Sequence, residues 1–300
     1  MKLVVAGHIA IDTIQTDDCT VNSIGGPPCY VGLTAKKLGC NVELITKVGY
    51  DFTEEYFVWL SKNGLTLEKN FHSKSYPTTR FKFILTENNM NRKVILQAKC
   101  QNLDLNQLDS IQADGMVINS IVGEISSSFI EKADGLVEHL FLDPQGHLRS
   151  FTDDGSSYLE PKIDFKIFKH IDMIKIGKGE LMALTGTTDH DTGMNRLKMK
   201  GVGNMIFTAS KGDVRVVFED NIHIIPIPKT KPVDTTGAGD IFVGAYEASF
   251  LKDGDALWAS CMGMSASYLS LSSSGISKIP PPNSVQEYAS KILETAKKKS

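Results

Sequence analysis

Short apolar segments that alternate with helical patterns constrain the fold of this chain more than any other feature. Most of these segments are followed by a stretch with the periodicity of a helix. Alternation of this kind is typical of a parallel sheet that helices bury on both faces. We therefore expect an α/β fold with a doubly wound, mostly parallel sheet. The expected strands are residues 3–6, 42–48, 116–118, 140–142, 173–176 and 204–208.

Two stretches, residues 12–23 and 81–97, break this alternation. In the second, apolar residues recur with period two on either side of Asn88 and Asn89, as in a β-hairpin. No internal repeat, low-complexity block or linker divides the chain. We therefore expect one domain over residues 1–300, with a small β-sheet inserted at these two stretches.

Composition excludes several classes of function. Hydrophobic residues make up 41% of the chain and charged residues 22%, which is ordinary for a globular protein and argues against disorder. The net charge of −3 and the lack of a long basic block argue against nucleic acid or a membrane surface as a partner. No apolar run is long enough for a membrane span or a signal peptide, so we expect a cytoplasmic protein. Five cysteines without a CxxC pair indicate reduced thiols.

Residues 233–246, with the sequence VDTTGAGDIFVGAY, place a carboxylate directly behind a glycine-rich helix start. Gly237 and Gly239 leave the backbone bare, so that free amides and the positive end of the helix dipole can face an anion. Asp240 then lies within reach of a hydroxyl nucleophile, which suits phosphoryl transfer. The alternative is a helix capped by a preceding threonine, with glycines that serve close packing. The ordered string DTTGAGD is more specific than glycines alone and favours the functional interpretation.

At these residues the chain resembles the ribokinase-like, or PfkB, carbohydrate kinases, whose second signature has the form DTTGAGD before a helix. The resemblance implies that Asp240 is the base toward the acceptor hydroxyl. It also implies an anion hole for the transferred phosphoryl, made by Gly237, Ala238 and Gly239. Its expected cofactors are ATP and Mg²⁺, with K⁺ near Asp234 and Thr236. In this family the small sheet is a lid that covers the acceptor site and excludes water, and it is a candidate surface for a homodimer.

A second match begins at Gly25 and Gly26 and runs to Leu38 and Gly39, and it is similar to the family's first signature. The sequence indicates a tight turn, prolines in a first helical turn and a glycine that ends the helix. The resemblance implies that the glycine pair lets the acceptor lie against bare backbone. Where the family often has an Asn that contacts the sugar, this chain has Tyr30. The aromatic side chain favours a cyclic polyol or a nucleoside over ribose or fructose.

Three further residues extend the acceptor side. Asp12 follows the first strand, where the family has an Asp that accepts hydrogen bonds from substrate hydroxyls. An ionised carboxylate offers acceptor sites only, which suits a polyol, and the alternative is a turn residue at the end of a strand. Asp143 and Arg149 follow another strand, in a stretch similar to one near the family's substrate, with Gln145 in place of Asn. A solvated loop position is the alternative for Arg149.

The donor side follows the family less closely. Lys175 and Glu180 match a stretch that ends Lys-Pro-Asn-x-x-Glu, but Gly177 replaces the Asn. The resemblance implies that Glu180 holds water on Mg²⁺, and Lys178 offers a positive charge beside the phosphates. The alternative for Glu180 is an acidic residue at a helix N-terminus. A loop that contacts ATP phosphates in the family is matched by Ser210, Lys211 and Gly212, most closely at the last two.

Three kinds of function are considered for these sequence features: a binding protein, an oxidoreductase and a kinase. A non-catalytic binding protein that keeps the fold is suggested by the replacements at Tyr30 and Gly177. A dinucleotide oxidoreductase would suit the alternating pattern, but Ala6-Gly7-His8 after the first strand lacks the G-x-G-x-x-G spacing. We therefore expect an ATP-dependent kinase for a hydroxyl of a sugar or of a cyclic polyol such as an inositol, with a nucleoside kinase as the alternative.

Overall fold

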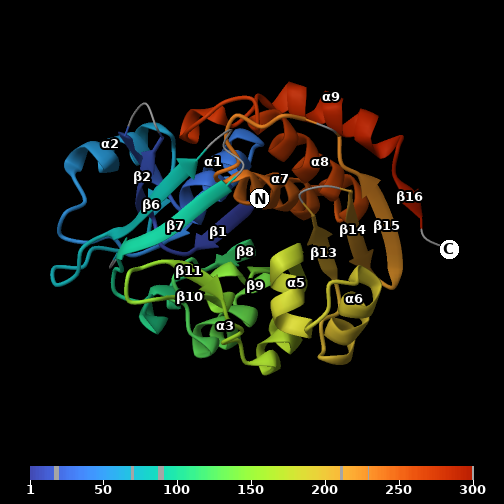
Figure 1. The fold of residues 1–300 in the computed structure, drawn as a ribbon, viewed down its shortest axis with the longest axis horizontal. Helices are drawn as coiled ribbons and strands as arrows, with labels where there is room; N and C mark the ends of the chain where they lie inside the picture. The colour runs from blue at the N-terminus through green and yellow to red at the C-terminus, as the bar shows by residue number, and fades with distance from the viewer. Residues whose placement is uncertain (17–19, 69–70, 87–90, 210–211, 229, 299–300) are drawn as a thin grey trace.

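A sheet of ten strands forms the centre of the part of the chain that the structure describes. The structure is a computed structural model, and it describes residues 1–16, 20–68, 71–86, 91–209, 212–228 and 230–298. Helices cover both faces of this sheet, and a smaller sheet stands at one side (Figure 1). In spatial order, the strands of the large sheet are β16 (Lys297–Lys298), β15 (Asn221–Pro226), β14 (Asp213–Phe218), β13 (Met205–Thr208), β12 (Met173–Gly177), β9 (Val137–Asp143), β8 (Ala113–Asn119), β1 (Lys2–Ala6), β4 (Asn41–Ile45) and β5 (Thr66–Leu67).

The strand pairing confirms the expected, mostly parallel sheet. β1 lies between β4 and β8 and is parallel to both, and the parallel order continues from β8 through β9 and β12 to β13. In chain order, β4 and β5 are therefore added on one side of β1, and β8 and the later strands are added on the other side. This makes the boundary between β1 and β8 a topological switch point, where loops at the carboxyl ends of the strands diverge and leave room for a ligand.

Beyond β13 the sheet continues in antiparallel order through β14, β15 and β16, which the sequence pattern does not predict. A two-residue turn at Glu219 and Asp220 joins β14 to β15, and these residues have φ angles of 47° and 64°. Hairpin turns with two positive φ angles favour Asn-Gly or Asp-Gly. Because the turn here has neither pair, the usual sequence signal for a hairpin is missing.

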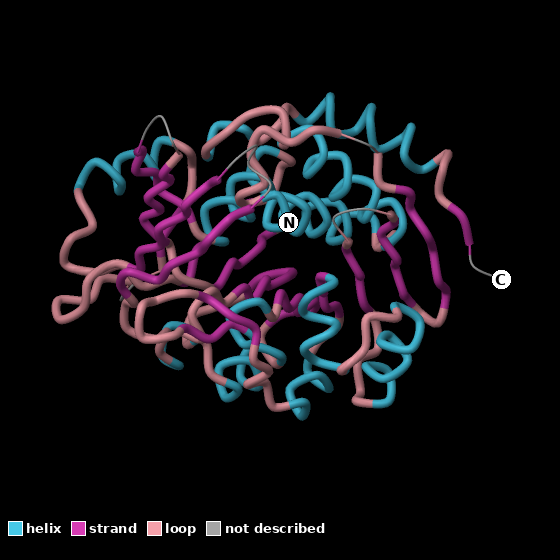
Figure 2. Tube along the Cα trace, viewed as in Figure 1, coloured by secondary structure: helices cyan, strands magenta, loops and turns pink. Residues whose placement is uncertain are grey.

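Two layers of helices enclose the large sheet (Figure 2). Leu3 and Val5 of β1 enter one core and Val4 and Ala6 enter the other, and all four are fully buried. One layer contains α1 (Pro27–Lys37), α7 (Ala238–Asp253), α8 (Ala256–Ser270) and α9 (Pro282–Leu293). The other contains α3 (Ser127–Asp134), α5 (Lys178–Thr185) and α6 (His190–Met199). The remaining elements are α2 (Glu54–Lys62), α4 (Gln145–Leu148), η1 (Leu105–Leu108), η2 (Phe165–His170), η3 (Ile276–Lys278), β10 (Arg149–Phe151) and β11 (Ser157–Leu159).

A separate sheet of four strands is built from the two stretches that break the alternation. Phe81 and Phe83 on its inner face pack against Ile121 and Val122, in the loop that follows β8. This sheet, which we call the lid, therefore leans over the carboxyl edge of the large sheet. In spatial order, its strands are β3 (Thr20–Gly25), β2 (Ala10–Gln15), β6 (Thr79–Thr86) and β7 (Asn91–Ala98).

The lid is anchored at the start of β6. The Asp51 carboxylate accepts a hydrogen bond from the Thr78 amide at 2.7 Å and two from the Arg80 guanidinium at 2.6 and 3.0 Å. These charge-assisted bonds hold the base of the lid against the rest of the molecule.

The hairpin turn expected at Asn88 and Asn89 lies outside the described residues. Within the described part of the chain, no helix is long and apolar enough to cross a membrane.

Candidate active site

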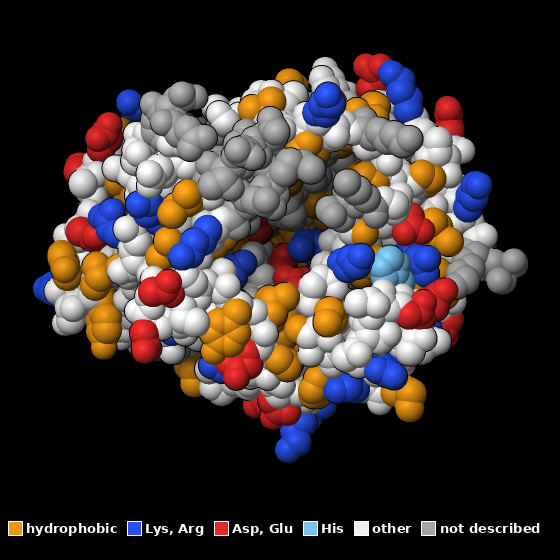
Figure 3. Space-filling view, in the orientation of Figure 1, with side chains coloured by type: hydrophobic (Ala, Val, Ile, Leu, Met, Phe, Trp, Pro, Cys, Tyr) orange, Lys and Arg blue, Asp and Glu red, His pale blue; other side chains and the backbone are white. Residues whose placement is uncertain are grey.

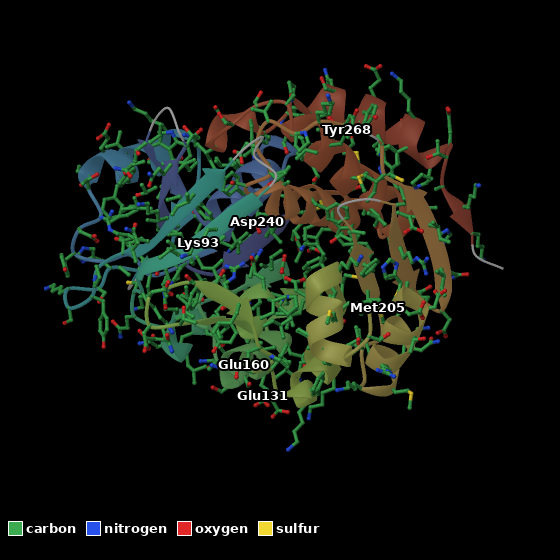
Figure 4. All side chains as sticks on the ribbon, viewed as in Figure 1. Lys93, Glu131, Glu160, Met205, Asp240 and Tyr268 are labelled. Atoms are coloured by element: carbon green, nitrogen blue, oxygen red, sulfur yellow. The ribbon has the colours of Figure 1, made fainter. Side chains whose placement is uncertain are left out.

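Helix α7 begins at a glycine with a left-handed backbone, beside the carboxyl edge of the sheet. Gly237, the residue before the first turn, has a φ of 71° and a ψ of 2°, which glycine adopts without strain. A Cβ atom at this position would lie 2.7 Å from the ring of Tyr30. Glycine therefore serves both the turn and the contact with the tyrosine. Asp240 follows in the first turn of α7, and it lies near the middle of the molecule (Figure 4).

The amino end of α7 is open to a ligand. Gly239 is exposed, and a Cβ atom built on it would lie 3.6 Å from Lys175 Nζ. The Ala238 amide donates to the Thr235 carbonyl oxygen at 3.2 Å, so the amides that follow it in the first turn are those that the helix itself leaves for a ligand. Figure 3 shows a hollow in the middle of the face of the molecule that is in view, with acidic and basic side chains inside it. Helix amides, the helix dipole and an ammonium group at one place suit an anion.

The Asp240 carboxylate is half-buried and held in position. Its Oδ1 accepts a hydrogen bond from Asn119 Nδ2 at 2.9 Å. Burial and the nearby Asp143 carboxylate raise the pKa of Asp240 to about 6, while Lys175 and the Asn119 hydrogen bond act in the opposite direction. A carboxylate whose pKa lies close to neutral pH is suited to general-base catalysis.

Asn119, the last residue of β8, connects Asp240 to the acceptor side, and the sequence motifs do not single it out. Its Oδ1 accepts a hydrogen bond from Gln145 Nε2 at 2.8 Å, and Gln145 Oε1 accepts one from Arg149 at 3.0 Å. Arg149 also donates to the Ile121 carbonyl oxygen at 3.3 Å, so it is not a solvated loop residue. A polar residue directly after an apolar strand was the available signal for Asn119, because parallel strands end at the same edge of a sheet.

Lys175 and Asp143 form a buried ion pair beside Gly239. The distance between Lys175 Nζ and Asp143 Oδ2 is 2.7 Å, and the two side chains are 9% and 2% exposed. Burial lowers the pKa of Lys175, but the carboxylates of Asp143, Glu180 and Asp240 together raise it above its ordinary value. The ammonium group therefore stays charged. The structure thus brings Asp143, expected on the acceptor side, together with a residue expected on the donor side.

Glu180 caps the start of α5. Its Oε2 accepts a hydrogen bond from the Gly177 amide at 2.7 Å, which fits an acidic residue at a helix N-terminus. Burial and the Asp143 carboxylate raise the pKa of Glu180, and Lys175 opposes them. Glu180 is therefore also part of the charged group around Lys175. Lys178, the first residue of α5, is exposed.

Four of the residues expected on the acceptor side, Asp12, Gly25, Gly26 and Tyr30, lie together where β2, β3 and α1 meet. Asp12 is 5% exposed, and a Cβ atom on Gly25 would collide with its carboxylate. Gly26 has a φ of 86°, and a Cβ atom there would collide with the His8 carbonyl oxygen. Burial and the Asp12 carboxylate raise the pKa of Tyr30, so its phenol stays neutral. Both glycines are thus required by close contacts around Asp12 and the start of α1.

Asp234 and Thr236 lie in the loop before α7, and both are buried. Asp234 Oδ1 accepts a hydrogen bond from the Thr236 amide at 2.7 Å. Its Oδ2 lies 3.3 Å from Lys278 Nζ, a residue that the sequence motifs do not single out. The K⁺ site expected at Asp234 and Thr236 stays a prediction, and within the described structure Asp234 pairs with a lysine of the chain itself.

Among the donor-side residues, Ser210 and Lys211 lie outside the described part of the chain, and Gly212 is exposed just before β14. Within the described residues, no group of three His, Cys, Asp or Glu side chains is placed to hold a metal ion by itself. In phosphate-transfer sites Mg²⁺ is held by one or two carboxylates together with water and substrate phosphates. The charges of Asp143 and Lys175 both act on the pKa of Glu180. Glu180 is therefore a candidate for the one carboxylate that such a Mg²⁺ site needs.

The geometry therefore joins a helix end suited to an anion, a buried cation and a carboxylate of raised pKa with a corner suited to hydroxyl groups. That combination suits the transfer of a phosphoryl group to an alcohol, in which positioning and charge stabilisation do most of the catalysis.

Comparison with known proteins agrees with this chemistry. The model of the pfkB family of carbohydrate kinases matches residues 1–282. A cytidine kinase of Thermococcus kodakarensis is 24% identical over 264 residues, which cover 84% of this chain and 89% of that protein. A solved pyrophosphate-dependent myo-inositol-1 kinase, converted by mutation into a myo-inositol-3 kinase, has a TM-score of 0.80 at 21% identity and covers 96% of this chain and 98% of its own. Ribokinase of Arabidopsis thaliana, complexed with ribose and ATP, has a TM-score of 0.77 at 17% identity, with coverage of 96% and 98%.

Proposed function

The chain belongs to the pfkB family of carbohydrate kinases, and we propose that it transfers the γ-phosphoryl group of ATP to a hydroxyl of a cyclic polyol such as an inositol, or of a nucleoside. The protein is a ribokinase-family phosphotransferase with an alcohol as acceptor. The position of Asp240 carries the proposal, because a carboxyl group with a pKa of about 6 lies in the first turn of α7, next to the anion-binding amides.

The donor phosphates bind at the start of α7. Backbone amides in the first turn hold the transferred phosphoryl, and the Lys175 ammonium neutralises its charge from the side of Gly239. Bound Mg²⁺ would neutralise further charge on the phosphates, and Glu180 would hold it through water. Lys178 is exposed at the start of α5, where it can reach a phosphate. Ser210, Lys211 and Gly212 are proposed to complete the ATP site.

The acceptor binds between the lid and the carboxyl edge of β8. Asp12 accepts hydrogen bonds from its hydroxyls, and Arg149 donates others from the opposite side. Tyr30 offers an aromatic wall for the C–H surface of a ring. The apolar contact of Phe81 with the loop at Ile121 closes the lid side and excludes water, which protects the donor from hydrolysis.

Asp240 orients the acceptor hydroxyl and removes its proton. Asn119 holds one carboxylate oxygen at 2.9 Å, which leaves the other for the hydroxyl. The proton is transferred late, because the phosphoryl group is already loosely bonded to both oxygens in the transition state and a free alkoxide is not needed. Lys175 acts at the same time, since it faces the Gly239 side of the transferring group.

A panel of acceptors with coupled detection of ADP tests the proposal. The panel contains inositols, cytidine and other nucleosides, ribose and fructose, and a parallel series replaces ATP with pyrophosphate and detects phosphate. We expect turnover with ATP, and higher kcat/KM for an inositol or a nucleoside than for ribose or fructose. If ribose or fructose is the best acceptor, the proposed substrate class is wrong. Tight ligand binding without turnover for any acceptor and either donor would instead support a non-catalytic binding protein.

A homodimer through the lid stays a prediction. The outer strand of the lid, β3, exposes Thr20, Val21 and Asn22, so its edge is free to pair in the described structure. Light scattering after size-exclusion chromatography measures the mass. A dimer that Val21→Lys converts to a monomer supports the lid as its interface, and a monomer at all concentrations contradicts the prediction.

A further inference from the structure

Lys278 places a buried ammonium group under the loop that leads into α7. The lysine ends the short helix η3, and its side chain is 0% exposed. Its Nζ donates to the Asp234 carbonyl oxygen at 3.2 Å and lies 3.3 Å from Asp234 Oδ2. One residue of the loop thus supplies both a neutral and a charged oxygen to the same cation.

A cation in this position is stable only because its partner is also charged. An ammonium group removed from water is strongly destabilising unless it is paired and hydrogen-bonded. Burial raises the pKa of Asp234, but Lys278 and the Thr236 amide outweigh this effect and lower it below its ordinary value. The Asp234 carboxylate also accepts from the Gly275 amide at 3.4 Å. The pair therefore joins η3 to the loop before α7 as a charged unit.

The ion pair is connected to the phosphoryl-binding amides through the backbone. Asp234 Oδ1 accepts from the Thr236 amide at 2.7 Å, and the Thr235 carbonyl accepts from the Ala238 amide at 3.2 Å. The first helical bond of α7 then runs from Ile241 to Gly237, at 2.8 Å. Each step fixes the next, so the direction in which the first-turn amides point depends on where Asp234 is held.

We propose that the Lys278 ammonium acts as a built-in monovalent cation for this loop, so that phosphoryl transfer does not require dissolved K⁺. The inference rests on the proposed kinase function and replaces the expectation of K⁺ at Asp234. Lys278 is a positioning residue, because it acts on the phosphoryl group only through the loop at residues 234–239. It carries one positive charge, as K⁺ does, and it already contacts a carbonyl and a carboxylate oxygen of Asp234, the kinds of oxygen that bind such an ion.

The experiment compares salts and variants in the full-length protein. Turnover is measured in KCl and in choline chloride at equal ionic strength, for the wild type, Lys278→Ala and Lys278→Met. The surface variant Lys291→Ala is the matched control, because Lys291 is 62% exposed and its ion pair in the described structure runs along its own helix to Glu287. Hydrogen exchange of the amides in residues 233–241 is followed in the same samples, and this readout needs no substrate.

We expect the wild-type kcat to agree within about twofold in the two salts, well below the effect of a true effector. Lys278→Ala should lower kcat by about ten- to a hundredfold and speed exchange in residues 233–241, while Lys291→Ala changes neither. Propylammonium, which matches the atoms removed by Lys278→Ala, should restore part of the lost activity, and K⁺ should restore a smaller part.

Two results would overturn the proposal. One is a wild-type enzyme that loses most of its activity in choline chloride. The other is a folded Lys278→Ala or Lys278→Met protein with unchanged kcat and unchanged exchange in residues 233–241. If Lys278→Ala fails to fold, Lys278→Met keeps the apolar stem and still removes the charge, and the comparison of salts needs no variant. If no acceptor is phosphorylated, the proposed function fails, whereas exchange in the two salts still decides whether the loop depends on K⁺.

Discussion

Helices α1 and α7 start in the same way but are suited to different ligands. Each follows a glycine with positive φ, 86° at Gly26 and 71° at Gly237, and neither has a side-chain cap. In α1 the next residues are Pro27 and Pro28, which have no amide hydrogen and are buried. In α7 the corresponding residues are Ala238 and Gly239, and Gly239 is exposed. A glycine start alone therefore does not make an anion site; the donors that follow it and their access to solvent decide.

The two helix starts also differ in the charge that lies beside them. The Asp12 carboxylate lies beside the start of α1, which suits the hydroxyl hydrogens of an acceptor. The Lys175 ammonium lies beside the start of α7, where it suits a phosphoryl group. The two starts are thus the acceptor side and the donor side of one proposed reaction. Substitutions in one should affect properties that substitutions in the other do not.

The largest expected effect comes from removing the base. Asp240→Asn keeps the shape of the side chain but cannot accept the proton, so kcat should fall by roughly two to four orders of magnitude. ATP binding, measured by calorimetry, should be retained because the amides and Lys175 are unchanged. Turnover close to that of the wild type would refute the role of Asp240.

Blocking the open helix start should be the next largest effect. Gly239→Val places a branched side chain in the phosphate path, and kcat should fall by about a hundredfold or more. Among the described residues, the end of Lys175 lies near its Cβ position, at 3.6 Å, and it is flexible, so the thermal midpoint should change little. A folded Gly239→Val protein with full activity would contradict the anion site at α7.

A substitution at the buried start of α1 should mainly lower the stability of the fold. Gly26 has a φ of 86° and a ψ of 157°, a region that only glycine occupies readily. Gly26→Ala should therefore lower the free energy of unfolding by about 1–3 kcal/mol from strain, with more from the collision at His8. Urea denaturation measures this. Equal stability losses for Gly26→Ala and Gly239→Val would remove the distinction between the two helix starts.

A smaller and more selective effect is expected at the acceptor side. Asp12→Ala removes a hydrogen-bond partner of the acceptor only, so KM for the acceptor should rise by about tenfold while KM for ATP stays within about twofold. Steady-state kinetics with each substrate varied in turn separates the two. Equal changes in both constants would show that Asp12 does not belong to the acceptor side alone.

The pH dependence gives the smallest expected change under ordinary conditions. Because burial and Asp143 raise the pKa of Asp240 to about 6, this proposed base is ionised above that pH and protonated below it. The value of kcat/KM should therefore be flat near neutral pH and fall about tenfold per unit below the pKa. Asp240→Asn supplies the control, since its residual rate should not follow this curve. A wild-type profile with no decline down to the ordinary pKa of an aspartate would mean that another group is the base.

Local sequence was enough to locate the two glycine starts and Asp240, because a turn and the helix after it are fixed by neighbouring residues. Asn119 and Lys278 could not be located in this way. Asn119 lies 121 positions from Asp240 in the chain and Lys278 lies 44 positions from Asp234, so their roles depend on strand order and on how η3 returns to the loop.

The fold shows the same limit. Apolar segments predicted the parallel strands, whose ends in the structure extend into polar residues such as Asn119 and Asp143 that periodicity does not mark. The antiparallel strands at the edge of the sheet were missed because the turn at Glu219 and Asp220 lacks the Asn-Gly or Asp-Gly pair that usually marks such a hairpin. The Glu219 amide donates to Asn204 Oδ1 at 3.0 Å, a contact between residues far apart in the sequence that local preference does not indicate.

The contact between Gly237 and the ring of Tyr30 has a consequence for changing the enzyme's acceptor. The ring carbons would lie 2.7 Å from a Cβ atom at Gly237, so the two sides of the proposed reaction share a wall. A smaller residue at position 30 would enlarge the proposed acceptor pocket and at the same time remove a contact from the turn before the amides that are proposed to bind the phosphoryl group. Selection for a new sugar at this position should therefore reward second substitutions around α7, and single replacements should trade specificity against speed.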